Sequence, residues 1–134
     1  MTTLVPRILV MACEPIAEIV CAMLRSAGYK CDAVRDHKTL LRMLKRLPNY
    51  DLLFCQVAAL EQEKKFFAWV LGQHIPLVTT AARNWEMVTK PISERSTAFL
   101  KMPFDREQLV ELIGKELAKG ENVAAASPTL RSKT

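Results

Sequence analysis

The chain has 134 residues, about half of them apolar, and a formal charge of +5. This length and composition predict one globular domain with a substantial core. They exclude a spanning helix, because every apolar run is far shorter than the roughly 18 residues that a membrane span needs. Part of the positive charge lies in the tail after Ala118, and the small remainder argues against nucleic-acid binding.

The four cysteines show no C-x-x-C spacing, and a chain of this size and apolarity needs no disulfide bonds to fold. They are Cys13, Cys21, Cys31 and Cys55. The N-terminus also lacks the succession of charged, apolar and small residues found in a secretory signal. We therefore expect reduced thiols and a cytoplasmic protein.

The first elements follow ordinary strand and helix patterns. Residues 7–12 are predicted to form a strand, and Pro15 then occupies a position that the first turn of a helix tolerates. Apolar residues recur at helical spacing until Gly28 ends the pattern. The predicted buried face of this helix consists of Ile16, Ile19, Val20, Met23, Leu24 and Ala27.

A short alternating strand is predicted over 29–34, followed by a helix over 36–47 with Asp36 as its N-cap. The exposed side of that helix is basic and carries Lys38, Arg42, Lys45 and Arg46. We expect a solvated face there and keep a partner-binding patch, or DNA binding, as alternatives.

Residues 51–56 are predicted to form the central strand, because Leu52 to Cys55 is a continuous apolar run. Gln56 ends this strand at the edge where parallel sheets bind their ligands. A helix over 60–71 follows. It is rich in aromatic residues, which we expect to pack mainly against the sheet, with an exposed ring for a partner as the alternative.

The next segment is predicted to contain a strand over 75–80 and a short helix over 84–89. Pro91 disfavours helix at the residue before it, so an extended segment is expected after position 89. A fifth strand is predicted over 97–101.

A last helix is predicted to begin at Asp105, with Gln108 completing a capping box. From Gly120 the sequence has no periodicity, and we expect a disordered tail. Strands that alternate with helices predict a three-layer α/β sandwich with a parallel sheet. The predicted domains are an N-terminal extension over 1–6, a core domain over 7–118 and a tail or linker over 119–134.

Four segments carry a resemblance to a known family: Ile8–Pro15, Asp51–Gln56, Ile75–Val78 and Leu100–Asp105. With the order of elements, they resemble the receiver domain of two-component response regulators over residues 7–118. The resemblance implies a flavodoxin-like (βα)5 fold with strand order 2-1-3-4-5. It also implies a site that accepts a phosphoryl group from a phosphohistidine onto an aspartate at the end of the third strand.

The residues that would carry this chemistry are replaced. At the positions that the resemblance assigns to the site stand Ala12, Cys13, Glu14, Gln56, Ala81 and Met102. Gln56 falls where the family has its phosphoacceptor aspartate, and an amide cannot form an acyl phosphate. Glu14 alone offers too few oxygens for Mg²⁺. Thr80 replaces Ala81 only if the strand end shifts by one residue, and Lys101 should point away from the site because side chains alternate along a strand.

The sequence therefore predicts a degenerate, pseudo-receiver domain: a phosphorylation-independent regulatory module that binds a protein partner and is not an enzyme. No cofactor or metal is expected. The candidate contact residues are Trp85, Met87, Arg95 and Phe99. Aromatic and Met side chains on an irregular segment are typical contacts, although Trp85 and Met87 could equally pack under the sheet edge.

Two other functions are kept as alternatives. Cys13 lies in the replaced site, so a thiol redox sensor is one of them. Small-ligand binding is the other, because doubly wound sheets often hold ligands between strands one and three. A homodimer is left open.

Overall fold

The structure is a computed structural model that describes residues 5–34, 39, 50–62, 64–82 and 88–126, with side chains up to residue 119. In chain order its elements are β1 (Arg7–Met11), α1 (Ile16–Ser26), β2 (Lys30–Val34), β3 (Leu52–Gln56), α3 (Val57–Gln62), α4 (Lys64–Leu71), β4 (Leu77–Ala81), α5 (Lys90–Arg95), β5 (Ala98–Lys101) and α6 (Arg106–Ala126). The strands form one parallel sheet in the order β2-β1-β3-β4-β5. This confirms the predicted fold class and strand order.

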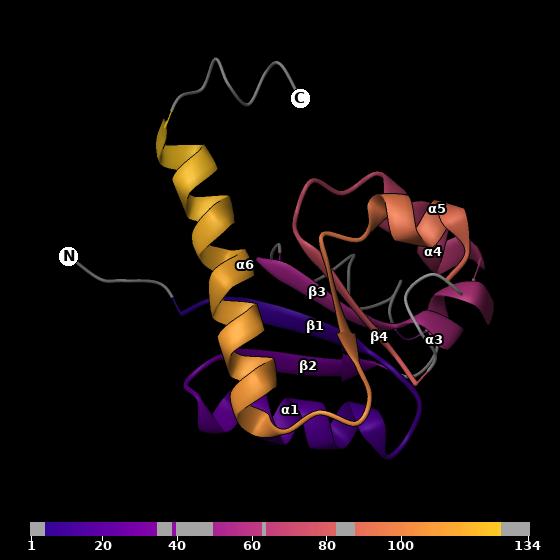
Figure 1. Ribbon diagram of the computed structural model, residues 1–134, viewed down its shortest axis with the longest axis horizontal. Helices are drawn as coiled ribbons and strands as arrows, with labels where there is room; N and C mark the ends of the chain where they lie inside the picture. The colour runs from indigo at the N-terminus through magenta and orange to yellow at the C-terminus, as the bar shows by residue number, and fades with distance from the viewer. Residues whose placement is uncertain (1–4, 35–38, 40–49, 63, 83–87, 127–134) are drawn as a thin grey trace.

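Helices cover both faces of the sheet, as Figure 1 shows. Helices α1 and α6 pack on one face, and α3, α4 and α5 pack on the other, so the predicted three layers are present. Each face has its own buried apolar cluster. Among the described residues, no helix is long and apolar enough to cross a membrane.

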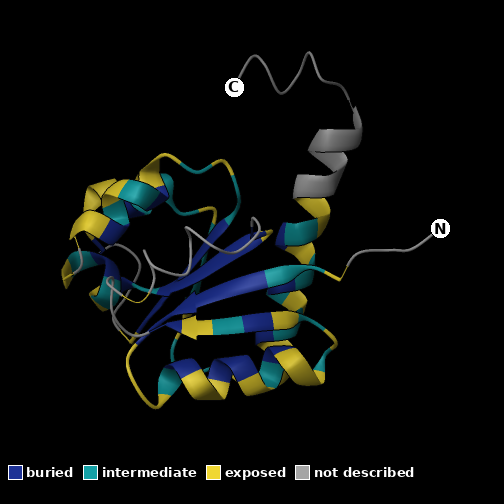
Figure 2. Cartoon of the chain, turned by 180° about the vertical axis from the view of Figure 1, so that it is seen from behind, coloured by how far each residue is buried: buried dark blue, intermediate teal, exposed yellow. Residues whose placement is uncertain are grey.

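Strand β3 lies in the middle of the sheet and is buried on both sides, as predicted. Its side chains alternate between the two clusters: Phe54 faces α1 and α6, whereas Cys55 faces α3 and α4. The central strands are dark blue in Figure 2 because almost every residue in them is buried. This continuous burial explains why an uninterrupted apolar run predicted the strand correctly.

Helix α1 begins after Pro15, and Gly28 follows its end with a positive φ of 98°. Both boundaries were predicted. The predicted buried face was partly wrong, because Ile19 is 49% exposed. The residues of this helix that are buried are Ala17, Val20, Cys21 and Leu24. The spacing of three and four residues fits either set, and the short side chains of Ala17 and Cys21 suit a close approach to the sheet.

The predicted helix over 36–47 and the contact candidates Trp85 and Met87 lie outside the described residues, apart from the helical Thr39. The predicted helix over 60–71 is present as α3 and α4, and its start was placed too late because α3 begins at Val57. Val57 is fully buried and belongs to the core. Strand β2 begins at Lys30, one position later than predicted.

Helix α5 corrects the prediction for the segment around Pro91. We expected an extended segment after position 89, but a helix begins at Lys90 with the proline in its first turn. A proline is tolerated there because the first N–H groups of a helix have no partner inside the helix. The Thr89 carbonyl accepts hydrogen bonds from the Ile92 and Ser93 N–H groups at 3.1 and 3.0 Å. The proposed short helix over 84–89 falls mostly outside the described residues.

The fourth strand runs over Leu77–Ala81, later than the predicted 75–80, because Pro76 has no N–H to donate to a ladder. Helix α6 begins with the predicted capping box. The Gln108 N–H donates to Asp105 Oδ1 at 2.8 Å, and the Asp105 N–H donates to Gln108 Oε1 at 2.9 Å.

The far end of α6 corrects the predicted tail. The helix continues to Ala126, although the sequence from Gly120 was expected to be disordered. Alanine is the best helix former, so the run of alanines over 124–126 favours helix even without an apolar face. The boundary of the core domain at residue 118 stays a prediction.

Candidate functional site at the carboxyl edge of the sheet

The candidate site lies where β1, β3, β4 and β5 end. Because all the strands are parallel, their carboxyl ends meet at one edge of the sheet. Gln56 ends β3 there, and Ala12 to Glu14 follow directly after β1. The structure thus brings together the sequence positions that the family resemblance assigned to one site.

Gln56 is half-buried and makes a specific contact across this edge. Its side-chain oxygen Oε1 accepts a hydrogen bond from the backbone N–H of Cys13, with 3.0 Å between nitrogen and oxygen. The amide therefore links the end of β3 to the segment that follows β1. The sequence predicted the position of Gln56 but not this bond, since its partner is a backbone N–H that every residue except proline supplies.

The segment after β1 offers little that could hold a cation. Ala12 is 1% exposed and apolar, while Cys13 and Glu14 are exposed. Mg²⁺ needs several oxygen ligands, and Glu14 supplies one carboxylate. No group of three or more His, Cys, Asp or Glu side chains suited to a metal ion occurs among the residues that the structure describes.

The ends of β4 and β5 carry the other two replaced positions. The Met102 N–H donates to the Ala81 carbonyl at 2.8 Å, which joins these two ends through the backbone. Ala81 is buried and Met102 is half-buried. Neither side chain can donate a hydrogen bond to an anion or neutralise its charge.

A register shift would bring Thr80 and Lys101 into the site, but neither takes the place of Ala81 or Met102 in this structure. Thr80 is completely buried, and its hydroxyl donates to the Leu100 carbonyl at 2.6 Å. That hydroxyl therefore joins β4 to the backbone of β5. Lys101 lies opposite Ala81 in the ladder and is exposed.

Replacing Gln56 with leucine is expected to lower the free energy of unfolding by about 1 kcal/mol, because the Cys13 N–H loses its internal acceptor. Gln56→Glu is the matched control. Its carboxylate can still accept the bond, so its loss should be no more than about half of that. Urea unfolding followed by circular dichroism measures both values. Equal stability of Gln56→Leu and the parent chain would show that the bond contributes nothing.

Arg95, a predicted contact residue, is half-buried and engaged with the protein itself. Its Nε donates to the Val70 carbonyl at 3.2 Å, and its Nη2 donates to the carbonyls of Gln73 and Ile75 at 3.0 and 2.9 Å. Burial lowers the pKa of this guanidinium, and the nearby Cys55 partly opposes that shift. Arg95 thus ties α5 to the end of α4 and to the segment before β4. Its place in a partner-binding surface stays a prediction.

Phe99, the other described contact candidate, is half-buried and packs against the cluster under α3, α4 and α5. Only part of its surface is available to a partner.

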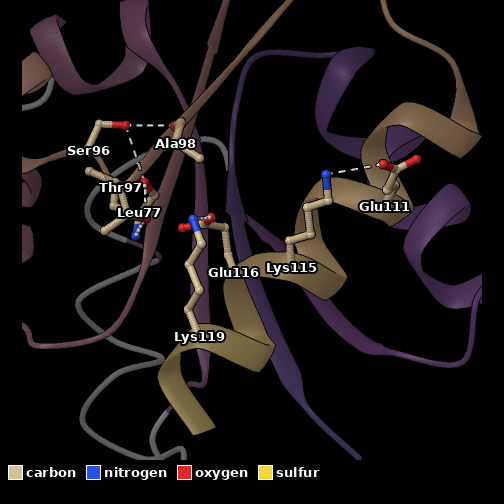
Figure 3. A network of polar contacts seen from close by, with 8 residues as sticks. All are labelled: Leu77, Ser96, Thr97, Ala98, Glu111, Lys115, Glu116 and Lys119. Atoms are coloured by element: carbon tan, nitrogen blue, oxygen red, sulfur yellow. Dashed lines mark hydrogen bonds and ion pairs between the residues drawn. The ribbon is translucent and has the colours of Figure 1, made fainter. Parts of the chain in front are cut away.

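A cluster of hydroxyl groups between β4 and β5 was not foreseen. Ser96 Oγ lies 2.7 Å from the Ala98 carbonyl and 2.9 Å from Thr79 Oγ1, and Thr97 Oγ1 accepts the Leu77 N–H at 3.0 Å. Figure 3 shows Ser96 and Thr97 directed at the strand backbone. The adjacent Ser and Thr before β5 were the available signal. These hydroxyls extend the pairing of the two strands beyond the ladder.

No protein-family model matches the chain, and no curated protein matches its sequence. Solved structures do match its fold. Chemotaxis response regulator CheY4 of Vibrio cholerae is 18% identical, with 84% of this chain and 98% of that chain covered and a TM-score of 0.71. A response regulator receiver protein from Burkholderia phymatum is 17% identical, with 84% and 95% covered and a TM-score of 0.73.

A third similar structure is the receiver domain of sensor histidine kinase PA1611 from Pseudomonas aeruginosa. It is 19% identical, with 86% of this chain and 99% of that chain covered and a TM-score of 0.64. That domain was crystallised with a magnesium ion coordinated in its active site cleft. The sheet order and these likenesses together show that the chain has the fold of the response regulator receiver domain.

Proposed function

We propose that this chain is a signalling module of the pseudo-receiver type, which acts by binding a protein partner and does not depend on phosphorylation. The observation that carries the proposal is the hydrogen bond from the Cys13 N–H to Gln56 Oε1 at 3.0 Å. An amide held by an internal bond stands at the strand end where phosphoryl acceptance would need a carboxylate.

The chemistry of the neighbouring side chains supports the same proposal. Phosphoryl transfer to an acceptor depends on a metal ion and cationic groups that offset the charge of the moving group. Ala12 and Met102 supply neither metal ligands nor positive charge. We therefore also propose that the chain is not an enzyme and works by binding alone.

The binding surface that we propose includes α5, β5 and α6, together with the segment before α5. Arg95 fixes α5 to the end of α4 through bonds to three carbonyls, so the α5 part of this surface is held in one arrangement. A fixed surface binds with little loss of conformational entropy, which favours a module that is always competent. Trp85 and Met87 remain proposed contacts within it.

The decisive experiment exposes the protein to acetyl phosphate and Mg²⁺ and then measures its intact mass. We expect no adduct, because the amide of Gln56 cannot form an acyl phosphate. A receiver domain that retains its aspartate is the positive control in the same buffer. A gain of about 80 Da on this chain, the mass of one phosphoryl group, would overturn the proposal.

A second readout uses beryllofluoride with Mg²⁺ and the backbone NMR signal of Cys13. That amide proton is bonded to Gln56, so any ion entering the edge would shift its resonance. We expect the resonance to stay unchanged. The thiol sensor built on Cys13 and the small-ligand alternative remain predictions. Cys55 is not placed to form a disulfide with Cys13, because its side chain faces the cluster under α3 and α4.

A further inference from the structure

Two cysteines that do not belong to the candidate site lie in direct contact. Cys21 comes from α1 and Cys31 from β2, and their Sγ atoms are 2.7 Å apart. Both side chains are buried, with 2% and 5% exposed. The sequence did not indicate this pair, because the two cysteines are ten positions apart. The buried face predicted for α1 also did not include Cys21.

The surroundings of the pair favour thiol reactivity. Arg25 lies one helical turn after Cys21, and its Nη2 donates to the Cys31 carbonyl at 2.7 Å. This bond holds a positive charge beside the two sulfurs, and cationic neighbours stabilise a thiolate. Among the strands that the structure describes, β2 is at one end of the sheet order, so none of them lies beyond Cys31.

The two thiols have unequal acidity. The hydrogen bond between the two sulfurs lowers the pKa of Cys21, and Arg25 acts in the same direction against burial and Asp32. The same hydrogen bond and burial raise the pKa of Cys31. Cys21 is therefore the better nucleophile, and Cys31 is placed to react second.

We propose that Cys21 and Cys31 form a reversible modification site, a dithiol that a peroxide oxidises to a disulfide between α1 and β2. The Cys21 thiolate attacks one peroxide oxygen and the O–O bond breaks, which with hydrogen peroxide gives a sulfenic acid and hydroxide. The hydroxide takes up the proton that the Cys21 thiol released and leaves as the first water. The Cys31 sulfur then attacks the Cys21 sulfur, the S–O bond breaks, and a second water leaves with the Cys31 proton. Two thiols and one hydrogen peroxide thus give one disulfide and two waters.

The geometry favours this pair over the other cysteines. The sulfurs need only approach from 2.7 Å to the roughly 2.05 Å of a disulfide bond. Cys55 is completely buried, and burial raises its pKa well above the usual value. Cys13 is exposed, so it serves as an internal control for simple surface oxidation.

The test treats the full chain with hydrogen peroxide, blocks the remaining thiols under denaturing conditions, and digests with trypsin and Glu-C together. These enzymes separate Cys21, in fragment 19–25, from Cys31, in fragment 31–35, and from Cys13. We expect the two fragments to be joined, with the loss of about 2 Da that accompanies disulfide formation. A thiol reductant should release them.

Three variants define the specificity. Cys21→Ala and Cys31→Ala should each abolish the joined fragments, whereas Cys13→Ala should retain them. If a variant that lacks one of the buried cysteines does not fold, the digest of the unmodified chain still tests the proposal. Blocked, unjoined fragments after oxidation, or a bond between any other pair, would overturn the proposal.

The melting temperature gives an independent measurement. Oxidation should raise it by roughly 5 °C or more, because the new bond closes a loop in the unfolded chain. A fall in melting temperature on oxidation would show that the bond does not fit the native fold, which would equally overturn the proposal.

Discussion

Replacing Phe66 with alanine is expected to lower the free energy of unfolding by about 3–5 kcal/mol, the range for removing a buried aromatic side chain. Phe66 lies on α4 with none of its surface exposed, in the cluster that joins this helix to the sheet. Its ring also stacks on Trp69, with 6.0 Å between centroids and 22° between planes. The variant loses the buried apolar surface of the ring and also its stacking contact with Trp69.

The neighbouring Phe67 provides the matched control. It has the same chemistry but is only half-buried, so Phe67→Ala should cost clearly less, about 1–2 kcal/mol. Urea unfolding monitored by circular dichroism measures both, provided that the slope with denaturant is unchanged. A larger loss for Phe67→Ala would mean that the aromatic face of α4 is oriented differently from the structure.

Arg95→Ala is expected to have the second largest effect, a loss of about 2–3 kcal/mol. Hydrogen bonds from charged groups each contribute about 1.5–3 kcal/mol, and the freed carbonyls of Val70, Gln73 and Ile75 recover part of this from water. The effect should also be local. Amide hydrogen exchange should accelerate around residues 72–76, where two of the three carbonyls lie.

Two controls separate the geometry of the guanidinium from its charge. Arg95→Lys keeps the charge but presents one nitrogen, so it should recover only part of the lost stability. Lys115→Ala removes an exposed ion pair with Glu111, seen in Figure 3, and should cost less than about 0.5 kcal/mol. If Arg95→Ala is as mild as Lys115→Ala, the guanidinium does not hold α5 in place.

Local signals in the sequence predicted the five strands, although β2 and β4 begin later than predicted, and the strand order came from the family resemblance. The apolar run of β3 and the reciprocal Asp105 and Gln108 pair both lie within a few residues, and both were predicted correctly. The prediction missed helix α5 because a proline breaks the interior of a helix but is tolerated in its first turn, so the effect of Pro91 depends on where the helix starts. A single residue type cannot supply that starting point.

The positions of the candidate-site residues could be predicted from the sequence more readily than the contacts that they make. Family resemblance located Gln56 and Ala12 at one edge, but the bond to the Cys13 N–H depends on backbone placement. The Cys21 and Cys31 contact was missed for a related reason. Two helical phases fitted the apolar pattern of α1 equally well, and packing in the cluster with the sheet and α6 selects the one that buries Cys21.

The bond between Gln56 and the segment after β1 has a consequence for the conditions under which the domain keeps its shape. A cluster of carboxylates at this edge would repel at neutral pH and would titrate as the solution turns acidic. Gln56 has no proton to gain or lose there, and it requires no counterion. The contact between Gln56 and the Cys13 N–H therefore joins two neutral groups, and neither of them gains or loses a proton on mild acidification.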